Sequence, residues 1–325
     1  MKKNNRYLFV DGNYLMHRSF HSISGLESSD GIATNAIYGF LKTFMMVLRR
    51  FSPGRILVAW DCMREENARV MWTKKLLKEG KIKKSYKSSR GKANKGDDLY
   101  TQFDYTKKIL GLLGVSQLMI NHFEADDIIA GAVSAVSLTK LKAHEIIILT
   151  GDKDYVQLLS FPNVRLCFYD VSKKEWVVYE SGDIIDGVKP EDWVYYGSLM
   201  GDASDDIPGV PGIGPAKAKV LMEHVAYEDI LRYNSLSVLD RACFRTGHSE
   251  NVLKIFDAVM KNYELFITSR ALKEMKGDVL RKSEKLIGCN FRLKKPSVKA
   301  LGEIFNELDM NEITPLHLIR CTGRL

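Results

Sequence analysis

The chain has 325 residues, 45% hydrophobic and 27% charged, as is ordinary for a globular protein with one large domain or two medium ones. It has no apolar run long enough to span a membrane, and its charged start leads into a strand pattern, not a signal peptide. The 5 cysteines form no CxxC pair and the 7 histidines show no HExxH spacing, which argues against zinc and predicts reduced thiols in a cytoplasmic protein.

The net charge of +8 suits a polyanionic partner, although many soluble proteins are basic for other reasons. The basic residues are concentrated between positions 74 and 95, a stretch that contains Glu79 as its single acid. One interpretation is a solvated loop without further function. The other is a mobile basic arm that becomes ordered on nucleic acid.

Hydrophobic patterns predict an α/β fold followed by a helical region. Strand patterns occur at 7–10, 56–60, 115–120, 146–149, 164–169 and 176–179, and helix patterns between them at 35–50, 98–113 and from 124. This alternation predicts a mostly parallel sheet with helices on both faces. Helix patterns then follow at 191–200, 215–225, 227–232, 249–261 and 297–309, whereas 270–296 has no clear pattern. We therefore expect a core at 1–185 and a helical region at 186–325.

Acidic residues follow the predicted strands. Because the carboxyl ends of parallel strands share one edge of a sheet, we expect these carboxylates to gather there. Two carboxylates ~6 Å apart repel by roughly 3 kcal/mol at an effective dielectric of about 20, so a gathered set needs cations. Oxygen ligands favour Mg²⁺ or Mn²⁺, and the alternative is a scatter of helix caps. The set comprises Asp11, Asp61, Glu124, Asp126, Asp127, Asp152 and Asp154.

A further acidic group at 201–206 directly precedes a glycine-rich turn and an amphipathic helix. The turn contains Gly209, Gly212 and Gly214, and no predicted strand with a nucleotide-binding pattern precedes it. Glycines allow the backbone to approach a phosphate, and the following helix offers free N–H groups to it. The turn therefore predicts sequence-independent contact with a DNA backbone, with an ordinary Pro/Gly turn as the alternative.

Taken together, these motifs resemble the 5′-nuclease (flap endonuclease) family, in the branch of phage 5′-exonucleases and the 5′-nuclease domain of bacterial DNA polymerase I. The resemblance covers roughly residues 6–225. The segments that carry it are 10–12, 36–40, 60–61, 86–90, 124–127, 150–154 and 200–217.

The resemblance implies a PIN-like core with two metal positions, filled by Mg²⁺ or by Mn²⁺ in its place. It assigns the first position to Asp11, Asp61, Glu124 and Asp126, with Asp127 close by. It assigns the second to Asp152, Asp154, Asp202 and Asp205.

The resemblance also implies a helical arch at about 70–97 and a helix–hairpin–helix at about 204–225, whose carbonyls often hold K⁺ in the family. Lys87 and Arg90, at the base of the arch, would act on the scissile phosphate, and Arg69 would have a similar role. The implied DNA-binding residues are Lys83, Lys84, Tyr86, Gly209, Gly212, Gly214, Lys217 and Lys219.

The chain departs from the family pattern in two places. It is about ten residues longer between Arg69 and Lys87 than the relatives we compare, which leaves the register of the arch open. Asp206 occupies a position where the family usually has Asn, so it is either a spare acid or a ligand in place of Asp205. The last hundred residues carry no usable resemblance.

We therefore expect a magnesium-dependent, structure-specific 5′-3′ exonuclease or flap endonuclease of replication or repair. Its substrates would be branched or flapped duplex DNA, with RNA/DNA hybrid as a further candidate. We expect a monomer in the cytoplasm of a bacterium or phage-infected cell, with replication proteins as candidate partners. The alternatives are a DNA-binding relative without catalysis, disfavoured because every ligand position is acidic, and a haloacid-dehalogenase-like phosphatase. The phosphatase would require a D-x-D pattern after the first strand, where this chain has Asp-Gly-Asn.

Overall fold

The computed structural model describes residues 6–89, 97–137, 145–170, 172–281, 286 and 290–323. The chain divides into two compact units: the first combines 1–63, 92–182 and 276–325, and the second combines 64–91 and 183–275. The boundary near 182 lies close to the predicted one at 185. However, residues 64–91 belong to the second unit and 276–325 to the first, because apolar side chains in these segments are buried there.

The first unit contains a six-stranded sheet with the order β3-β2-β1-β4-β5-β6. All neighbouring strands are parallel except the pair β5 and β6, which is antiparallel. The mostly parallel sheet expected from the strand and helix patterns is confirmed. The strands are β1 (Arg6–Asp11), β2 (Arg55–Trp60), β3 (Ser116–Met119), β4 (Glu145–Thr150), β5 (Val164–Asp170) and β6 (Glu175–Glu180).

Strands β1, β2 and β4 are buried on both faces of the sheet. In β1, Leu8, Phe9 and Val10 have no exposed surface, although successive side chains point to opposite faces of the sheet. Such continuous apolar runs are typical of parallel strands covered by helices on both sides.

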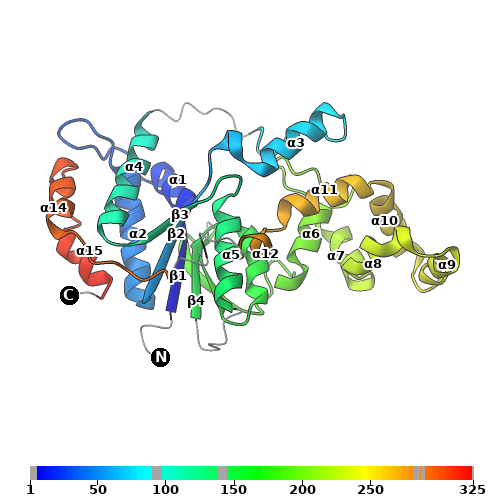
Figure 1. The fold of residues 1–325 in the computed structure, drawn as a ribbon. Helices are drawn as coiled ribbons and strands as arrows, with labels where there is room; N and C mark the ends of the chain where they lie inside the picture. Colours follow the sequence, from blue (N-terminus) through cyan, green and yellow to red (C-terminus); the bar gives the residue numbers. More distant parts are fainter. Residues whose placement is uncertain are drawn as a thin grey trace. The chain divides into compact units, whose positions relative to one another are not determined.

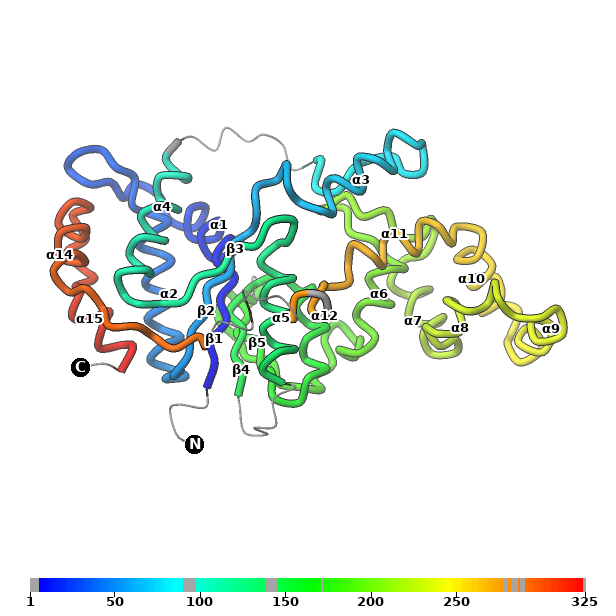
Figure 2. The backbone as a smooth tube through the Cα atoms, in the orientation of Figure 1, coloured from blue at the N-terminus to red at the C-terminus, as the bar shows by residue number. Residues whose placement is uncertain are grey.

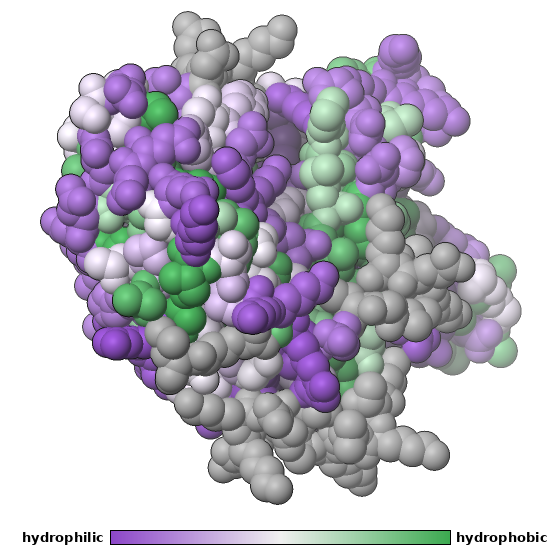
Figure 3. All heavy atoms as spheres, turned by 60° about the vertical axis from the view of Figure 1, so that its left-hand side comes forward, coloured by the Kyte–Doolittle hydropathy of each residue, from purple (hydrophilic) through white to green (hydrophobic). Residues whose placement is uncertain are grey.

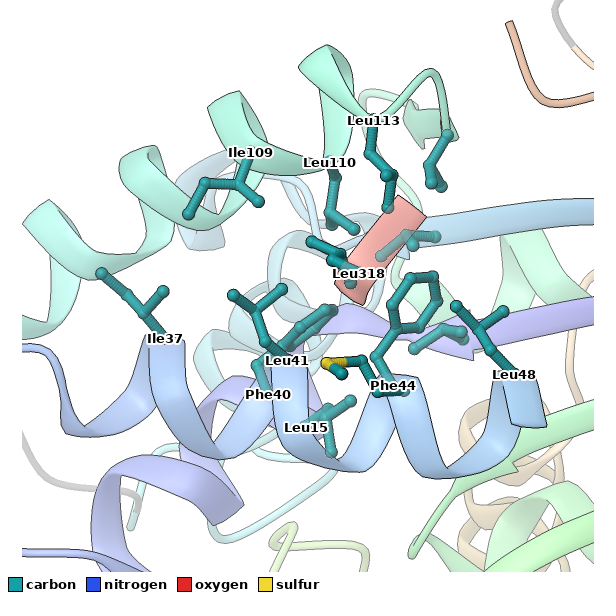
Figure 4. Packing of buried hydrophobic residues seen from close by; sticks show 14 of the residues in the cluster. Leu15, Ile37, Phe40, Leu41, Phe44, Leu48, Ile109, Leu110, Leu113 and Leu318 are labelled. Carbon is teal, nitrogen blue, oxygen red and sulfur yellow. The ribbon is translucent and has the colours of Figure 1, made fainter. Parts of the chain in front are cut away.

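One face of the sheet is covered by α1 (Gly12–Ser22), α2 (Asn35–Phe51) and α4 (Asp97–Leu112), as Figure 1 shows. Side chains of α2 pack against Leu110 of α4, against Leu113 just after it, and against Leu318 of α15 (Pro315–Cys321) (Figure 4). The neighbouring helix α14 (Val298–Glu307) contributes Leu301 and Phe305 to the same core. This packing explains why the end of the chain belongs to the first unit.

The opposite face is covered by α5 (Ala125–Ser137), and the short helix α12 (Gly277–Leu280) lies against α5 (Figure 2). The approach is close: a Cβ atom at Gly131 would lie 2.7 Å from Cβ of Leu280. The 3₁₀ helix η3 (Lys153–Ser160) follows β4. Residues 277–280 fall in the stretch for which the sequence predicted no element.

The second unit is helical apart from turns. Its main core includes Tyr195, Leu199, Leu221, Phe256 and Phe266. The 3₁₀ helices are η2 (Arg64–Glu66), η4 (Pro190–Asp192) and η5 (Tyr233–Ser235). The α-helices are α3 (Ala68–Lys78), α6 (Trp193–Met200), α7 (Pro215–His224), α8 (Tyr227–Arg232), α9 (Val238–Thr246), α10 (Glu250–Lys261) and α11 (Tyr263–Lys273).

Part of the basic stretch is described, up to residue 89, and its mobility in the free protein stays a prediction. Its first part forms α3, which begins at a side-chain cap from Asn67. Val70 and Tyr86 pack with Ile207 and Leu272 of the same unit. A few apolar side chains are therefore sufficient, because the rest of the unit supplies the partners that the stretch lacks by itself.

Hydrophilic side chains cover much of the face seen in Figure 3, with smaller apolar groups between them. Within the described parts of the chain, no helix combines the length and the apolar character that a membrane crossing requires.

Candidate active site

The acidic residues of the first unit follow three adjacent strands. Asp11 is the last residue of β1, Asp61 comes directly after β2, and Asp152 comes two residues after β4. In the strand order, β1 lies between β2 and β4, so the chain reverses its direction of winding at β1. Open α/β sheets bind ligands at the carboxyl ends of the strands beside such a reversal.

Asp11 is held in place by three donors. One carboxylate oxygen, Oδ1, accepts a hydrogen bond from the main-chain N–H of Tyr14 (2.9 Å) and so caps α1. The other, Oδ2, accepts from the hydroxyls of Thr150 (3.3 Å) and Tyr155 (3.2 Å). Sequence reasoning missed Thr150 and Tyr155, although both flank the acidic motif at 152–154.

The electrostatic environment of Asp11 is strongly unfavourable to its charge. Burial raises the pKa of this carboxyl, and the charges of Asp61, Asp152 and Asp126 raise it further, to about 8. The hydrogen bond from Tyr14 opposes this shift but does not cancel it. Burial raises the pKa of the Tyr155 hydroxyl well above its ordinary value, and the charges of Asp11 and of the other three aspartates raise it further. The charges of the neighbouring acids therefore act most strongly on Asp11, which is the buried member of this set of four aspartates.

The other acids of this unit are oriented by the ends of helices. Oδ1 of Asp61 accepts a hydrogen bond from the N–H of Ala125, the first residue of α5 (2.8 Å). Oδ1 of Asp152 caps η3 through the N–H of Asp154 (2.8 Å). Glu124 is 7% exposed and directly precedes α5. These contacts fix the orientation of the two capping aspartates, because an N–H group donates to each of them.

Asp127 has a structural contact in addition to its acidic neighbours. It is 2% exposed, and its Oδ1 accepts a hydrogen bond from the N–H of Lys276 (2.7 Å), just before α12. The side chain thereby links α5 to the returning chain. The prediction that Asp127 lies close to a metal stays a prediction.

The chemistry of the donors suits a hard divalent cation. Asp11, Asp61, Asp126 and Asp152 are oxygen donors whose charges repel one another, and a cation would relieve that repulsion. Across the residues that the structure describes, no three Asp, Glu, His or Cys side chains are grouped closely enough to hold an ion by themselves. The oxygen donors therefore suit a hard divalent cation that keeps part of its water shell.

The second unit contains the acidic turn, which we define as residues 202–206. Oδ2 of Asp202 pairs with Nζ of Lys273 on α11 at 2.8 Å. Burial raises the pKa of Asp202, but the charge of Lys273 and hydrogen bonds outweigh it and lower the pKa overall. Asp205 is 6% exposed, and its main-chain oxygen accepts a hydrogen bond from the N–H of Lys87 (2.8 Å). The assignment of Asp202 and Asp205 to a second metal stays a prediction.

The predicted cationic residues differ in exposure. Lys83 and Lys84 are exposed, whereas Arg69 is only 7% exposed and its guanidinium carbon lies 6.0 Å from the centre of the Tyr86 ring. Nζ of Lys87 lies 4.8 Å from the same ring centre. Arg90 lies outside the described residues.

Tyr86 is buried in this structure, and its predicted contact with DNA stays a prediction. Its side chain is 4% exposed and packs with Val70 and Leu272, and its N–H donates to the hydroxyl of Thr73 (3.0 Å). A ring buried in this way contributes to the stability of the second unit.

The three glycines of the turn differ in how closely other atoms pack around them. Gly209 has φ 61°, and a Cβ there would lie 2.6 Å from main-chain atoms of residues 200–201, so tight packing demands glycine. Gly212 has φ 79° and Gly214 is the N-cap of α7, and a Cβ at either would meet nothing within 4 Å. The open part of the turn is therefore at 212–214. Two lysines border it: Lys217, whose Nζ donates to the Gly212 carbonyl (2.9 Å), and the half-buried Lys219.

Comparison with known proteins identifies the family. The family described as 5′-3′ exonuclease, N-terminal resolvase-like domain, matches residues 6–186, more than half of the chain. The chain belongs to this family, as its motifs predicted. The 5′-3′ exonuclease of Aquifex aeolicus is 29% identical over 318 residues, which cover 94% of this chain and 92% of that protein.

DNA polymerase I of Thermus aquaticus is 30% identical over 268 residues, and that of Mycobacterium bovis is 29% identical over 277. These matches cover 80% and 84% of this chain but only 28% and 27% of the polymerases, so the chain spans about a quarter of their length.

Solved structures support the fold. A phage T5 5′-exonuclease with bound zinc has a TM-score of 0.60 at 18% identity and covers 94% of this chain and 98% of its own. The catalytic core of Rad2 in complex with DNA substrate has a TM-score of 0.55 at 12% identity and covers 98% of this chain and 92% of its own. The predicted PIN-like fold class is confirmed.

Proposed function

We propose that the protein is a divalent-metal-dependent 5′-nuclease that hydrolyses phosphodiester bonds in branched or flapped duplex DNA. The observation that carries the proposal is the position of Asp11, Asp61 and Asp152 at the carboxyl ends of the adjacent strands β1, β2 and β4. The raised pKa of Asp11, caused by burial and by its acidic neighbours, agrees with this geometry. A set of mutually repelling carboxylates at a ligand-binding edge is expected where a metal completes the site. Membership of the 5′-3′ exonuclease family supports the same reading.

When bound, Mg²⁺ ions would offset the charge of the carboxylates, lower the pKa of an attacking water and stabilise the leaving oxygen. Asp11, Asp61, Glu124 and Asp126 are the residues that would hold the first ion, some of them through waters bound to the metal. Thr150 and Tyr155 would keep Asp11 oriented through their hydroxyl groups. The requirement for Mg²⁺, its exchange for Mn²⁺ and a K⁺ ion at the glycine turn belong to this proposal.

Asp152 and Asp154 supply further carboxylates beside β4 for the second ion. Asp152 is exposed and fixed by a cap to η3, so it can meet a hydrated ion without losing its orientation. Lys87 would place positive charge where the phosphoryl oxygens become more negative during reaction. Lys217 and the open glycines at 212–214 would contact the backbone of the duplex part of the substrate.

The experiment uses a 5′-flap duplex labelled at either end, incubated with the protein in Mg²⁺, in Mn²⁺ and in EDTA. We expect release of the flap with a 5′-phosphate on the product, and no cleavage in EDTA. Matched substrates with an RNA flap or a blocked 5′ end separate substrate preference from the chemical step. Absence of cleavage in both metals, with tight flap binding, would support the alternative of a DNA-binding relative without catalysis.

Asp152→Asn is the sharpest variant for this proposal. It should abolish cleavage while binding of flap DNA in Ca²⁺ persists or tightens, because one repulsive charge near the phosphates is removed. Asp104→Asn, at an exposed position on α4, is the matched control. Near-normal turnover of Asp152→Asn in Mg²⁺ would refute the two-metal mechanism.

A further inference from the structure

Asp206 is the acid for which the sequence offered two readings, a spare carboxylate or a metal ligand. In the structure its side chain is 1% exposed, and its carboxylate contacts residues of the segment 84–89. Oδ2 accepts hydrogen bonds from the N–H of Ser89 (2.5 Å) and the hydroxyl of Ser88 (3.1 Å). Oδ1 accepts from the hydroxyl of Ser89 (2.6 Å) and lies 3.3 Å from Nζ of Lys84.

Main-chain contacts reinforce the same junction. The N–H of Lys87 donates to the carbonyl of Asp205 (2.8 Å), and the carbonyl of Lys87 accepts from the guanidinium of Arg64 (2.8 Å). Lys87 and Asp206 both adopt left-handed backbone conformations, with φ 54° and 57°. Such conformations are unfavourable for residues other than glycine and persist only where surrounding contacts hold them.

The acidic turn itself is rigidly supported. Asp202 and Ile207 exchange two main-chain hydrogen bonds (2.9 and 2.8 Å), which close the turn. Lys273 holds the Asp202 side chain, and the hydroxyl of Ser269 accepts from the N–H of Gly209 (2.8 Å), so α11 supports both ends. A segment fastened to this turn therefore has a fixed position within the second unit.

We propose that Asp206 is a positioning residue that fastens the segment bearing Lys84 and Lys87 to the acidic turn, and that it is not a metal ligand. Its two carboxylate oxygens already accept from three protein donors and pair with one ammonium group, so a cation is not needed to balance the charge. Burial raises the pKa of Asp206, but its hydrogen bonds from Ser89, Lys84 and Ser88 outweigh it and lower the pKa to about 2, as expected for such a carboxylate. The consequence for catalysis rests on the proposed nuclease function, whereas the fastening itself does not.

Limited digestion with trypsin tests the fastening directly, because cleavage of a folded protein follows the population of locally open states. Asp206→Ala removes several hydrogen bonds to a charged group, so we expect cleavage after Lys83, Lys84 or Lys87 to become about tenfold faster or more. Asp206→Asn retains an acceptor for Ser89 and should stay within about threefold of the wild type.

Two further variants keep the test interpretable. Asp257→Ala removes an ion pair with Arg245 elsewhere in the second unit and should leave these cleavage rates unchanged. The double variant Ser88→Ala/Ser89→Ala removes donors while Asp206 remains, and should accelerate cleavage without adding to the effect of Asp206→Ala. Circular dichroism and thermal unfolding verify that each variant is folded.

The catalytic consequence is measured with a 5′-flap duplex. In Asp206→Ala, single-turnover cleavage should fall about tenfold or more while the Kd for the flap in Ca²⁺ changes less than about threefold, with rescue in Asp206→Asn. The Mg²⁺ concentration for half-maximal rate should remain unchanged. Unchanged tryptic cleavage in Asp206→Ala overturns the proposal, as does a large rise in the Mg²⁺ requirement. Faster tryptic cleavage in a protein whose wild type has no nuclease activity would instead refute the proposed function and leave the fastening intact.

Discussion

Neutralising Asp11 should stabilise the metal-free protein at high pH, although it removes a residue proposed to be essential for cleavage. The folded protein holds this carboxyl with a pKa of about 8, against an ordinary value of 3.8. Between those pH values the folded state binds a proton that the unfolded state lacks. The stability that depends on this proton is therefore present at low pH and is lost as the pH rises toward 8.

The size of the effect follows from the shift. One proton changes the free energy of unfolding by about 1.4 kcal/mol per pH unit, so moving from pH 5 to pH 8 removes up to about 4 kcal/mol. Asp11→Asn keeps the shape of the side chain without its charge, at a cost of about 1 kcal/mol for altered hydrogen bonds. The net gain at pH 8 is then up to about 3 kcal/mol, which at roughly 2 °C per kcal/mol should raise the Tm of the variant by up to about 6 °C over that of the wild type. At pH 5 the advantage should largely disappear, because most of the stability that depends on the proton bound by the folded state is then still present.

The assay is thermal unfolding in EDTA, followed by circular dichroism at several values between pH 5 and pH 8. Asp104→Asn, at an exposed position, is the control for the loss of one negative charge. Adding Mg²⁺ at pH 8 should raise the Tm of the wild type more than that of Asp11→Asn. A difference between the wild type and Asp11→Asn that does not change with pH would refute the reasoning, as would a wild type equally stable at pH 5 and pH 8.

Two further predictions concern the second unit. Gly209→Ala should lower the free energy of unfolding by about 2 kcal/mol or more in urea, because its Cβ would collide with the main chain of residues 200–201. Gly214→Ala, at φ −106° with open space around it, should unfold like the wild type, and equal losses in both variants would contradict the packing argument. Lys87→Ala should slow single-turnover cleavage with a modest effect on binding, whereas Lys83→Ala should mainly weaken binding. The reverse pattern would mean that the register of the arch is shifted.

Local sequence patterns were sufficient for most of the sheet. The predicted strand at 7–10 is found as β1 (Arg6–Asp11), and the predicted helix at 35–50 as α2 (Asn35–Phe51). These elements could be predicted because apolar spacing and chain direction act over a few neighbouring residues. The same local reasoning placed acidic residues at the carboxyl ends of strands, since a polar residue directly after a buried strand must lie at the edge of the sheet.

Local patterns failed where a segment depends on partners far away in the chain. Residues 68–78 form α3, and Tyr86 is buried, because Ile207 and Leu272 complete their packing. Likewise, α14 and α15 close the core of the first unit, although the sequence predicts a helical region separate from that core. Contacts of this range leave no periodic trace in either segment by itself.

For the candidate site too, the sequence determined some features and the tertiary structure determined others. The sequence alone determined which acids, lysines and glycines are present and that several of them follow strands. Only the tertiary structure decided that β2, β1 and β4 are adjacent, so that the acids at their ends raise the pKa of Asp11. It also decided that the carboxylate of Asp206 is occupied by Ser88, Ser89 and Lys84. The physical reason is that a residue type supplies a charge or a donor, whereas burial and partners depend on how distant segments pack.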